Sequence, residues 1–334
     1  MILSTPIWAA IFLVATCVSL AASNVLVRRL EGFAARLGLS EAILGLISAL
    51  AANSPEMTSA ITALATGEHD IGIGVVLGSN VFNLAALLGL GALVAGSIDL
   101  RRAAVVLTGS VGAWAVLGAL TVVGGDLPPV FGLLVVLVVV IPYVAIAAAP
   151  QLLHSLLLPT GWSAVVRRAL FEEEIELAEA IRRRRGRGRD AALAATMLVT
   201  VIGASVVMER SASLLGSRFQ LATIVVGGLV LAAVTSLPNA VAAIYLARRG
   251  RGAAVLSEAM NSNMLNVVVG FLLPASMIGL ANASAGGGLI AAAFAAGLTL
   301  CALALAYRGH GLRRWSGGLL VVGYLAFAAV LIAR

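Results

Sequence analysis

Long apolar runs separated by short polar segments dominate this chain. Each run is about 20 residues long or longer, which is enough for an α-helix to cross the hydrocarbon core of a bilayer. The pattern predicts an all-α polytopic membrane protein with about ten membrane-spanning helices. The predicted spans are 7–27, 42–66, 71–97, 103–123, 130–149, 191–208, 220–247, 253–278, 286–306 and 315–333.

The composition excludes an ordinary soluble domain. Apolar residues make up 61% of the chain and charged residues 11%, whereas soluble domains carry about 25% charged residues. Cys17 and Cys301 both fall within predicted spans, which favours small apolar filling over a disulfide or metal framework. We keep 7–27 as a helix and not a cleaved leader, because no basic segment precedes it and it has a counterpart at 190–210.

The arginines predict the orientation in the membrane. All 22 basic side chains are arginines, and most lie at 28–36, 101–102, 167–189, 248–251 and 308–314. With ten spans these segments share one side, which the positive-inside bias makes cytoplasmic. We therefore expect a multi-pass plasma-membrane protein with both termini outside. Anionic lipid accounts for the basic run at 182–189, so nucleic acid is not an expected partner.

A charged segment at 150–190 divides the chain into two halves, 1–149 and 191–334, of five predicted helices each. In this segment the acids come early and the arginines late, as a helix dipole favours, and the apolar stripe is partial. We predict a cytoplasmic linker helix lying on the membrane surface. The acids at 172–176 are interpreted as a solvated face, with a regulatory ion site as the alternative.

The two halves share a repeat. Residues 45–83 align without a gap on residues 228–266, so each half contains a proline within an apolar helix, followed by a Ser-Asn cluster. Since five helices is an odd number, the second copy enters the membrane from the opposite side. Inverted repeats of this kind are frequent in secondary transporters, whose ion sites lie at the repeat interface near the midplane. The recurring positions in the first copy are Gly45, Leu46, Ala49, Pro55, Ala60, Ile61, Gly67, Ser79, Asn80 and Asn83.

Glu56 is the first candidate for the functional site. Only Glu56 and Glu258 are acids well inside predicted spans, where an ionisable group is costly and points to function. Pro55 removes a backbone donor, so the carbonyls around Ala51 and Ala52 lose their helical partner. A hard cation such as Ca²⁺ or Na⁺ favours carbonyl oxygens together with a carboxylate. Pro238 is expected to break its helix in the same way and to free the carbonyls around Val234 and Thr235.

A second polar cluster has the spacing to join this site. Ser79 and Asn83 are four residues apart on one helix face, as are Ser262 and Asn266. Their oxygens can complete a coordination shell around Glu56. Glu258 precedes Ser262 by four residues, and two roles stay open for it, an inner ligand or a partner of an arginine at the membrane interface.

These motifs resemble the two alpha repeats of the sodium/calcium exchanger (cation/Ca²⁺ antiporter) superfamily. The blocks are Asn53-Ser-Pro-Glu56 with Gly78-Ser-Asn-Val-Phe-Asn83, and Thr235-Ser-Leu-Pro-Asn239 with Asn261-Ser-Asn-Met-Leu-Asn266. The alpha regions would span about 42–97 and 220–278. The resemblance implies a central site, alternately open to each side, where Na⁺ and Ca²⁺ compete. It makes Glu56 the central carboxylate, lined by Thr235 and Ser236 and completed by Ser79, Asn83, Ser262 and Asn266.

The chain departs from the family pattern at three places. Ala52-Asn53 stands where Thr-Ser usually precedes Leu-Pro-Glu, Asn239 replaces the second acidic residue, and Asn266 occupies a place that is acidic in some members. Asn53 and Asn239, with Glu258, complete the candidate ligands. A unit charge in such a site contributes roughly 4 kcal/mol at an effective dielectric of about 20, so the missing carboxylate should weaken divalent binding most.

Three functions therefore stay open. The first is a secondary active antiporter of Ca²⁺ and Na⁺. The second is an exchanger of a monovalent cation or of a cation against H⁺, which the single carboxylate favours. The third is a non-transporting membrane sensor or assembly protein. None of the three needs a cofactor, and each places the chain in a lipid bilayer.

Overall fold

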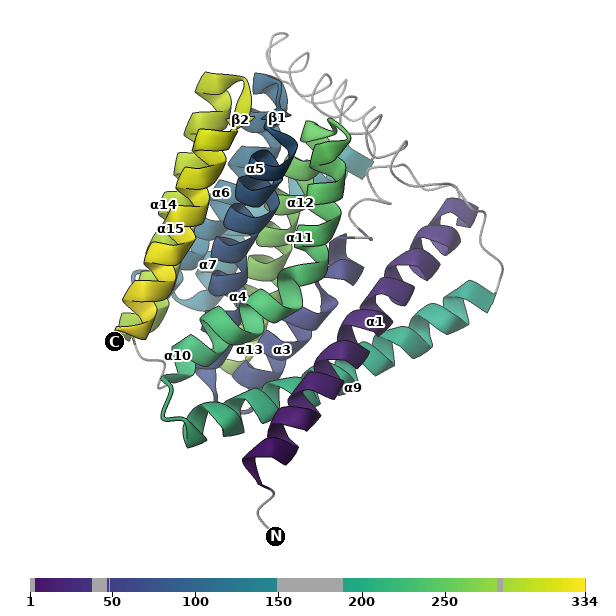
Figure 1. Ribbon diagram of the computed structural model, residues 1–334, viewed down its shortest axis with the longest axis vertical. Helices are drawn as coiled ribbons and strands as arrows, with labels where there is room; N and C mark the ends of the chain where they lie inside the picture. The colour runs from purple at the N-terminus through teal and green to yellow at the C-terminus, as the bar shows by residue number, and fades with distance from the viewer. Residues whose placement is uncertain (1–3, 38–46, 48, 149–188, 281–284, 334) are drawn as a thin grey trace.

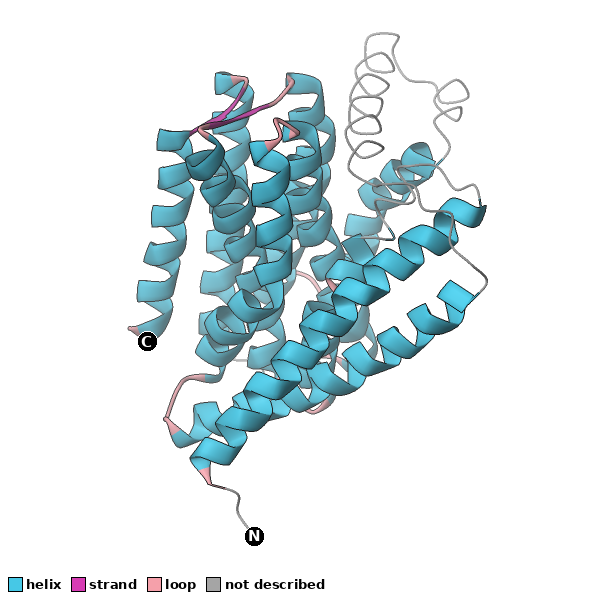
Figure 2. Cartoon of the chain, turned by 45° about the vertical axis from the view of Figure 1, so that its right-hand side comes forward, coloured by secondary structure: helices cyan, strands magenta, loops and turns pink. Residues whose placement is uncertain are grey.

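The computed structural model describes residues 4–37, 47, 49–148, 189–280 and 285–333. Helices make up nearly all of it (Figure 1, Figure 2). Nine helical segments within these residues are long and apolar enough to cross a membrane. The predicted span 42–66 lies partly outside the described residues, and the predicted linker helix 150–190 lies largely outside them. The prediction of a helical, multi-pass membrane protein is confirmed.

The first half of the chain forms a series of helices and one short strand. In chain order they are α1 Thr5–Leu37, α3 Ser54–Ala65, α4 His69–Asn83, the π-helix η1 Leu84–Leu90, α5 Gly91–Ala95, β1 Ser97–Asp99, α6 Arg102–Val123 and α7 Pro129–Ala148.

The second half follows the same plan. Its elements are α9 Arg189–Arg218, α10 Thr223–Val225, the π-helix η3 Val226–Leu231, α11 Ala232–Arg248, α12 Gly252–Leu265, the π-helix η4 Asn266–Leu272, α13 Leu273–Ile278, α14 Ala285–Gly309, β2 Gly311–Arg313 and α15 Arg314–Ile332.

Element boundaries recur at the spacing of the sequence repeat. The continuous helical run α4–η1–α5 spans 69–95, and the run α12–η4–α13 spans 252–278, which is the same range shifted by 183 residues. The same shift relates the end of α3 at Ala65 to the end of α11 at Arg248, and the start of α6 at Arg102 to that of α14 at Ala285. The repeat seen in side chains is thus also present in the secondary structure.

Corresponding helices of the two halves run in opposite directions. Along α1 and α9, Arg218 Nη1 donates to Thr5 Oγ1 (3.0 Å), the hydroxyls of Ser19 and Ser205 are hydrogen-bonded (2.8 Å), and Arg29 Nη1 donates to Asp190 Oδ1 (2.8 Å). Figure 1 shows the two helices side by side. Two oppositely oriented copies would give this pairing, so the predicted inverted repeat has support from contacts as well as from sequence.

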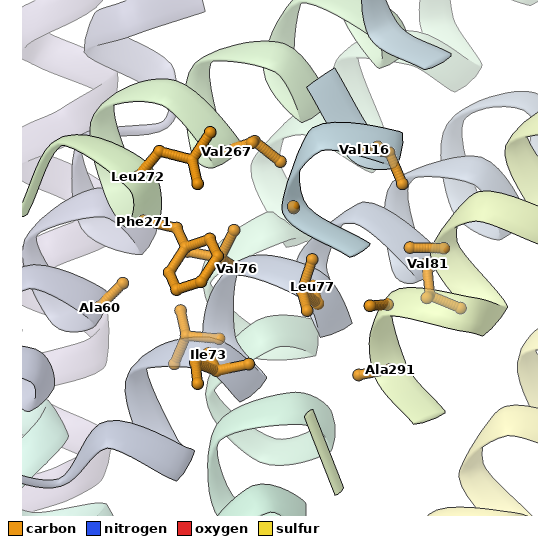
Figure 3. Close-up of a cluster of buried hydrophobic side chains, with 14 of the residues drawn as sticks. Ala60, Ile73, Val76, Leu77, Val81, Val116, Val267, Phe271, Leu272 and Ala291 are labelled. Atoms are coloured by element: carbon orange, nitrogen blue, oxygen red, sulfur yellow. The ribbon is translucent and has the colours of Figure 1, made fainter. Parts of the chain in front are cut away.

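The centre of the molecule is α4, which packs backbone to backbone on η3. A Cβ atom at Gly74 would lie 2.8 Å from the Gly228 nitrogen, and one at Gly78 would overlap the Gly228 carbonyl oxygen. Small residues four apart allow membrane helices to approach this closely. Around this contact lies an apolar core in which Ile73 and Leu77 of α4 are close to Phe271 of η4 (Figure 3).

A two-stranded sheet joins the halves at one end of the molecule. β1 pairs antiparallel with β2, with Ser97 opposite Arg313, and the start of α12 at Gly252 lies against the Asp99 carbonyl (Figure 1). The segments that carry Arg101, Arg251 and Arg313 therefore gather at this end. This agrees with the prediction that arginine-rich segments share one side, whereas the identity of that side stays a prediction.

Candidate cation site

Asn53 and Glu56 lie where the helix that contains Pro55 is interrupted. Residues 49–52 are helical, Asn53 is in a turn, and α3 begins at Ser54 with Pro55 in its first turn. Proline is favoured at this position because the first amides of a helix have no acceptor within the helix. Asn53 and Glu56 are both fully buried. The predicted break at Pro55 is confirmed.

The carbonyls freed by this break accept hydrogen bonds from serine hydroxyls, so they do not need a cation to satisfy them as the sequence analysis expects. Ser54 Oγ donates to the Ala51 oxygen (2.6 Å), and Ser23 Oγ of α1 donates to the oxygens of Ala51 (3.0 Å) and Ala52 (3.4 Å). Hydroxyls of Ser and Thr commonly satisfy backbone carbonyls at proline sites in membrane helices. These two carbonyls therefore have protein partners.

The expected break at Pro238 is also wrong. The α-helix α11 continues from Ala232 to Arg248 through Pro238. Thr235 Oγ1 donates to the carbonyls of Leu231 (2.8 Å) and Ala232 (3.3 Å), one turn earlier. The irregularity lies before α11, in the π-helix η3, so the proline is accommodated without interrupting the helix.

Side chains from three helices meet around the break in α3. Ser236 Oγ of α11 donates to Glu56 Oε1 (2.8 Å), and Asn239 Nδ2 donates to Asn53 Oδ1 (2.9 Å). Asn53 Nδ2 in turn donates to Ser262 Oγ of α12 (2.9 Å) and to the Ala49 carbonyl (2.7 Å). The five predicted site residues thus form two hydrogen-bonded groups, Glu56 with Ser236, and Asn53 with Asn239 and Ser262. Asn53 and Asn239, which both depart from the family pattern, bind each other.

Four asparagines form a second, nearly symmetric network. Asn80 Nδ2 donates to the Asn263 carbonyl and Asn263 Nδ2 to the Asn80 carbonyl, both at 3.2 Å and between residues 183 apart. Asn83 Nδ2 donates to Asn263 Oδ1 (3.0 Å), and Asn266 Nδ2 donates to Asn80 Oδ1 (3.4 Å). Each half thus orients an asparagine of the other half. Asn83 and Asn266 stand where α4 and α12 give way to π-helices, a frequent feature of functional sites.

The atoms that these networks leave without a partner are all oxygens. Within the described part of the chain no hydrogen bond reaches Glu56 Oε2, Ser79 Oγ, Asn83 Oδ1 or Asn266 Oδ1, and all four residues are fully buried. Buried polar atoms are normally hydrogen-bonded, so such groups call for a missing ligand. One carboxylate and neutral oxygens are a donor set suited to a hard cation.

The remaining predicted ligands differ in their surroundings. Ser79 is fully buried, and Thr235 uses its hydroxyl hydrogen within α11. Glu258 lies on α12 one turn before Ser262 and is only partly buried, in contrast to Glu56. Its role stays a prediction.

The sequence analysis leaves out two residues of the site, Asn80 and Asn263. Asn263 holds the amide of Asn83, Asn80 holds that of Asn266, and the recurrence of both at the repeat spacing is the signal that could have found them. Glu209 lies outside this site, but it is a further acid that the sequence analysis wrongly leaves out of the membrane helices. The predicted span ends at 208, whereas α9 continues to Arg218 and Glu209 is 1% exposed.

The sequence matches the sodium/calcium exchanger protein family over residues 7–158 and 191–333, which is most of the chain. The chain belongs to this family. Both alpha regions and all the candidate ligands of this exchanger-family protein fall within the matched ranges.

Named relatives and solved structures agree with this assignment. This chain is 37% identical over 103 residues to the putative antiporter CaxA of Alkalimonas amylolytica, a match that covers 30% of this chain and 32% of CaxA. The fold of this chain is that of native YfkE (16% identity, TM-score 0.65, covering 97% of this chain and 92% of YfkE).

Two further exchanger structures share the fold. The H⁺/Ca²⁺ exchanger CAX has 16% identity and a TM-score of 0.67, with 98% of this chain and 86% of CAX covered. The sodium-calcium exchanger NCX_Mj has 19% identity and a TM-score of 0.61, with 98% and 99% covered.

Proposed function

We propose that the protein is a secondary active cation antiporter that exchanges Ca²⁺ against Na⁺ or H⁺, with alternating access to a site centred on Glu56. Membership of the exchanger family supports this function, as does the similarity to a putative antiporter. The site would lie near the membrane midplane, between two oppositely oriented halves.

The observation that carries the proposal is the set of buried oxygens without a partner. Glu56 Oε2 and Asn83 Oδ1 come from the first half, and Asn266 Oδ1 comes from the second, so a cation bound to all three would link the halves. The asparagine network fixes the direction of both amides, because their nitrogens are already used as donors. Oxygens held in place in this way lower the cost of ordering a site when the ion binds.

Ion selectivity would depend on the single carboxylate. Asn239 uses an amide hydrogen to bind Asn53, which a carboxylate at this position could not do. The site therefore offers one negative charge. A single charge favours the binding of one monovalent cation, or competition between Ca²⁺ and a proton, and it disfavours the binding of several Na⁺ together. Glu56 Oε2 can accept either a metal ion or a proton, so the two would compete for the same atom.

The experiment is exchange in proteoliposomes that contain the purified protein. Vesicles loaded with radioactive calcium are diluted into buffers that impose an opposing Na⁺ or H⁺ gradient. Calcium efflux that depends on either gradient supports the antiporter. If no Na⁺, Ca²⁺ or H⁺ gradient drives any cation, the alternative of a non-transporting sensor or assembly protein takes its place.

A further inference from the structure

A second carboxylate is buried in the structure, away from Glu56. Glu209 lies in the last third of α9, is 1% exposed, and its Oε2 has no hydrogen-bond partner among the described residues. A buried carboxylate oxygen without a partner is costly, and in a membrane helix it points to an ion or proton path. The predicted cation site does not use it.

The register of α1 against α9 places Glu209 at the same level as a second residue with an unpartnered oxygen. Ser19 and Ser205 are hydrogen-bonded where the two antiparallel helices face each other. One turn further along this pair, in the same direction, come Thr16 on α1 and Glu209 on α9, since residues three or four apart share a face. Thr16 is buried, and its hydroxyl also lacks a partner within the described ranges.

The helix α3 connects this region to Glu56. Ser59 lies one turn after Glu56, is fully buried, and its hydroxyl is unpartnered in the described structure. α3 packs on α9, and Glu68 follows α3 in the chain. Buried oxygens without partners thus extend from Glu56 along α3 to the contact between α1 and α9.

This region lies at the end of the molecule opposite β1 and β2. Glu68 caps the start of the helical run α4–η1–α5, whereas β1 follows the end of that run. By the predicted topology this is the outer end.

We propose that Glu209 is a second cation-binding carboxylate, which together with Thr16 and Ser59 forms the path by which Ca²⁺ or Na⁺ enters the Glu56 site from this end. This inference rests on the proposed antiport function. It supplies the second negative charge that Asn239 does not provide, at a separate position along the path.

The test is the variant Glu209→Gln, which keeps the size of the side chain and removes its charge. Exchange is measured in proteoliposomes with the cation supplied first from one side and then from the other. We expect the KM for Ca²⁺ to rise on the order of tenfold on the side of Glu209, as the loss of a charged ligand implies. The KM on the other side should change little. An unchanged KM on both sides would overturn the inference.

Asp126→Asn is the matched control. Asp126 is an exposed carboxylate in the connection between α6 and α7, at the same predicted side of the membrane but on other helices. This variant removes the same charge and should leave the KM at its wild-type value. If Asp126→Asn raises the KM as much as Glu209→Gln, general surface charge explains the effect and the inference fails.

Two further variants test the path without touching a charge. Ser59→Ala and Thr16→Val remove hydroxyls that have no partner, so in a merely structural position they should raise the Tm and leave the KM unchanged. In a cation path they raise the KM on the Glu209 side. They carry the test if Glu209→Gln does not fold. If the wild-type protein shows no exchange, the proposed antiport function is refuted. If the wild type exchanges cations and all three variants keep its KM, only the proposed path is refuted.

Discussion

At the scale of single residues, Glu56 is a buried carboxylate with one oxygen bonded to Ser236 and the other unpartnered. In Glu56→Gln the negative charge is lost, and we expect gradient-driven calcium exchange to fall to the level of empty vesicles. Calcium should also no longer raise the Tm. In wild-type protein, Ca²⁺ at 100 times its Kd would stabilise the fold by about 2.7 kcal/mol.

Ser236→Ala is the comparison variant for Glu56→Gln. It removes the donor to Glu56 Oε1 but keeps the charge, so exchange should be weakened and not abolished. Equal loss in both variants would mean that folding, and not the charge of Glu56, is the cause.

The pair Asn53 and Asn239 yields a second prediction at this scale. In Asn239→Glu the amide that donates to Asn53 Oδ1 is replaced by a carboxylate. A carboxylate oxygen then faces the Asn53 oxygen without a hydrogen bond, and the repulsion between the two oxygens offsets the gain in negative charge for Ca²⁺ binding. The double variant Asn53→Ser with Asn239→Glu brings both positions to the family's residues and should bind Ca²⁺ more tightly than either single variant. The coupling should lie at about 0.5–3 kcal/mol, as for residues in contact.

Calcium titration of all four proteins, by isothermal calorimetry, checks this coupling. Strictly additive free energies of binding would show that the two departures are independent. A double variant that binds Ca²⁺ no more tightly than wild type would refute the missing-carboxylate hypothesis.

At this scale the sequence analysis names residues that the structure also brings together. Glu56, Ser236, Ser262 and Asn53 can be named because polar groups in apolar helices are few. The hydrogen bonds of Ser23 to the carbonyls of Ala51 and Ala52 could not be predicted, since no local pattern shows that a serine of another helix reaches them.

At the scale of elements, the contact between α4 and η3 depends on glycines that leave no room for a side chain. Gly78→Ala would place a methyl group into the Gly228 carbonyl. We expect a loss of about 1–3 kcal/mol of stability, as for overpacked cores, and a lower Tm in detergent.

Gly203→Ala is the matched control, because a Cβ atom at this α9 position meets nothing within 4 Å. It should keep or slightly raise the Tm, since alanine favours helix more than glycine does. If the two variants have the same Tm, the close contact between α4 and η3 does not limit stability.

The two prolines show why elements are harder to predict than residue types. Pro55 and Pro238 occupy equivalent places in the repeat, but only the first coincides with an interruption of its helix. The outcome depends on neighbours: an asparagine turn in one half, and a threonine that bonds back to its own helix in the other. The π-helices were not foreseen either, because they carry no distinctive composition.

At the scale of the whole molecule, the arginine distribution makes a prediction about orientation. In a background where Cys17 and Cys301 are replaced by alanine, Asp126→Cys should react with a membrane-impermeant thiol reagent in intact cells. Arg249→Cys, near the end with β1 and β2, should react only after permeabilisation. The reverse labelling pattern would invert the topology.

The architecture could be predicted at this scale because the repeat and the arginine spacing are properties of the entire chain. The burial of Glu209 could not be predicted. A span predicted from hydropathy ends at 208, where polar residues begin, whereas α9 continues for another ten residues to Arg218. Its environment comes from α1 and α3, which no single segment of sequence describes.

The exchange of hydrogen bonds between Asn80 and Asn263 has a consequence for biosynthesis. Synthesis at about 5–20 residues per second separates two positions 183 residues apart by roughly 10–40 s. During that interval the carboxamide of Asn80 lacks its partner on α12. We expect a chain truncated before α12 to be retained by insertion factors or degraded, so that quality control in the membrane, and not only ion transport, selects for the pairing of the two halves.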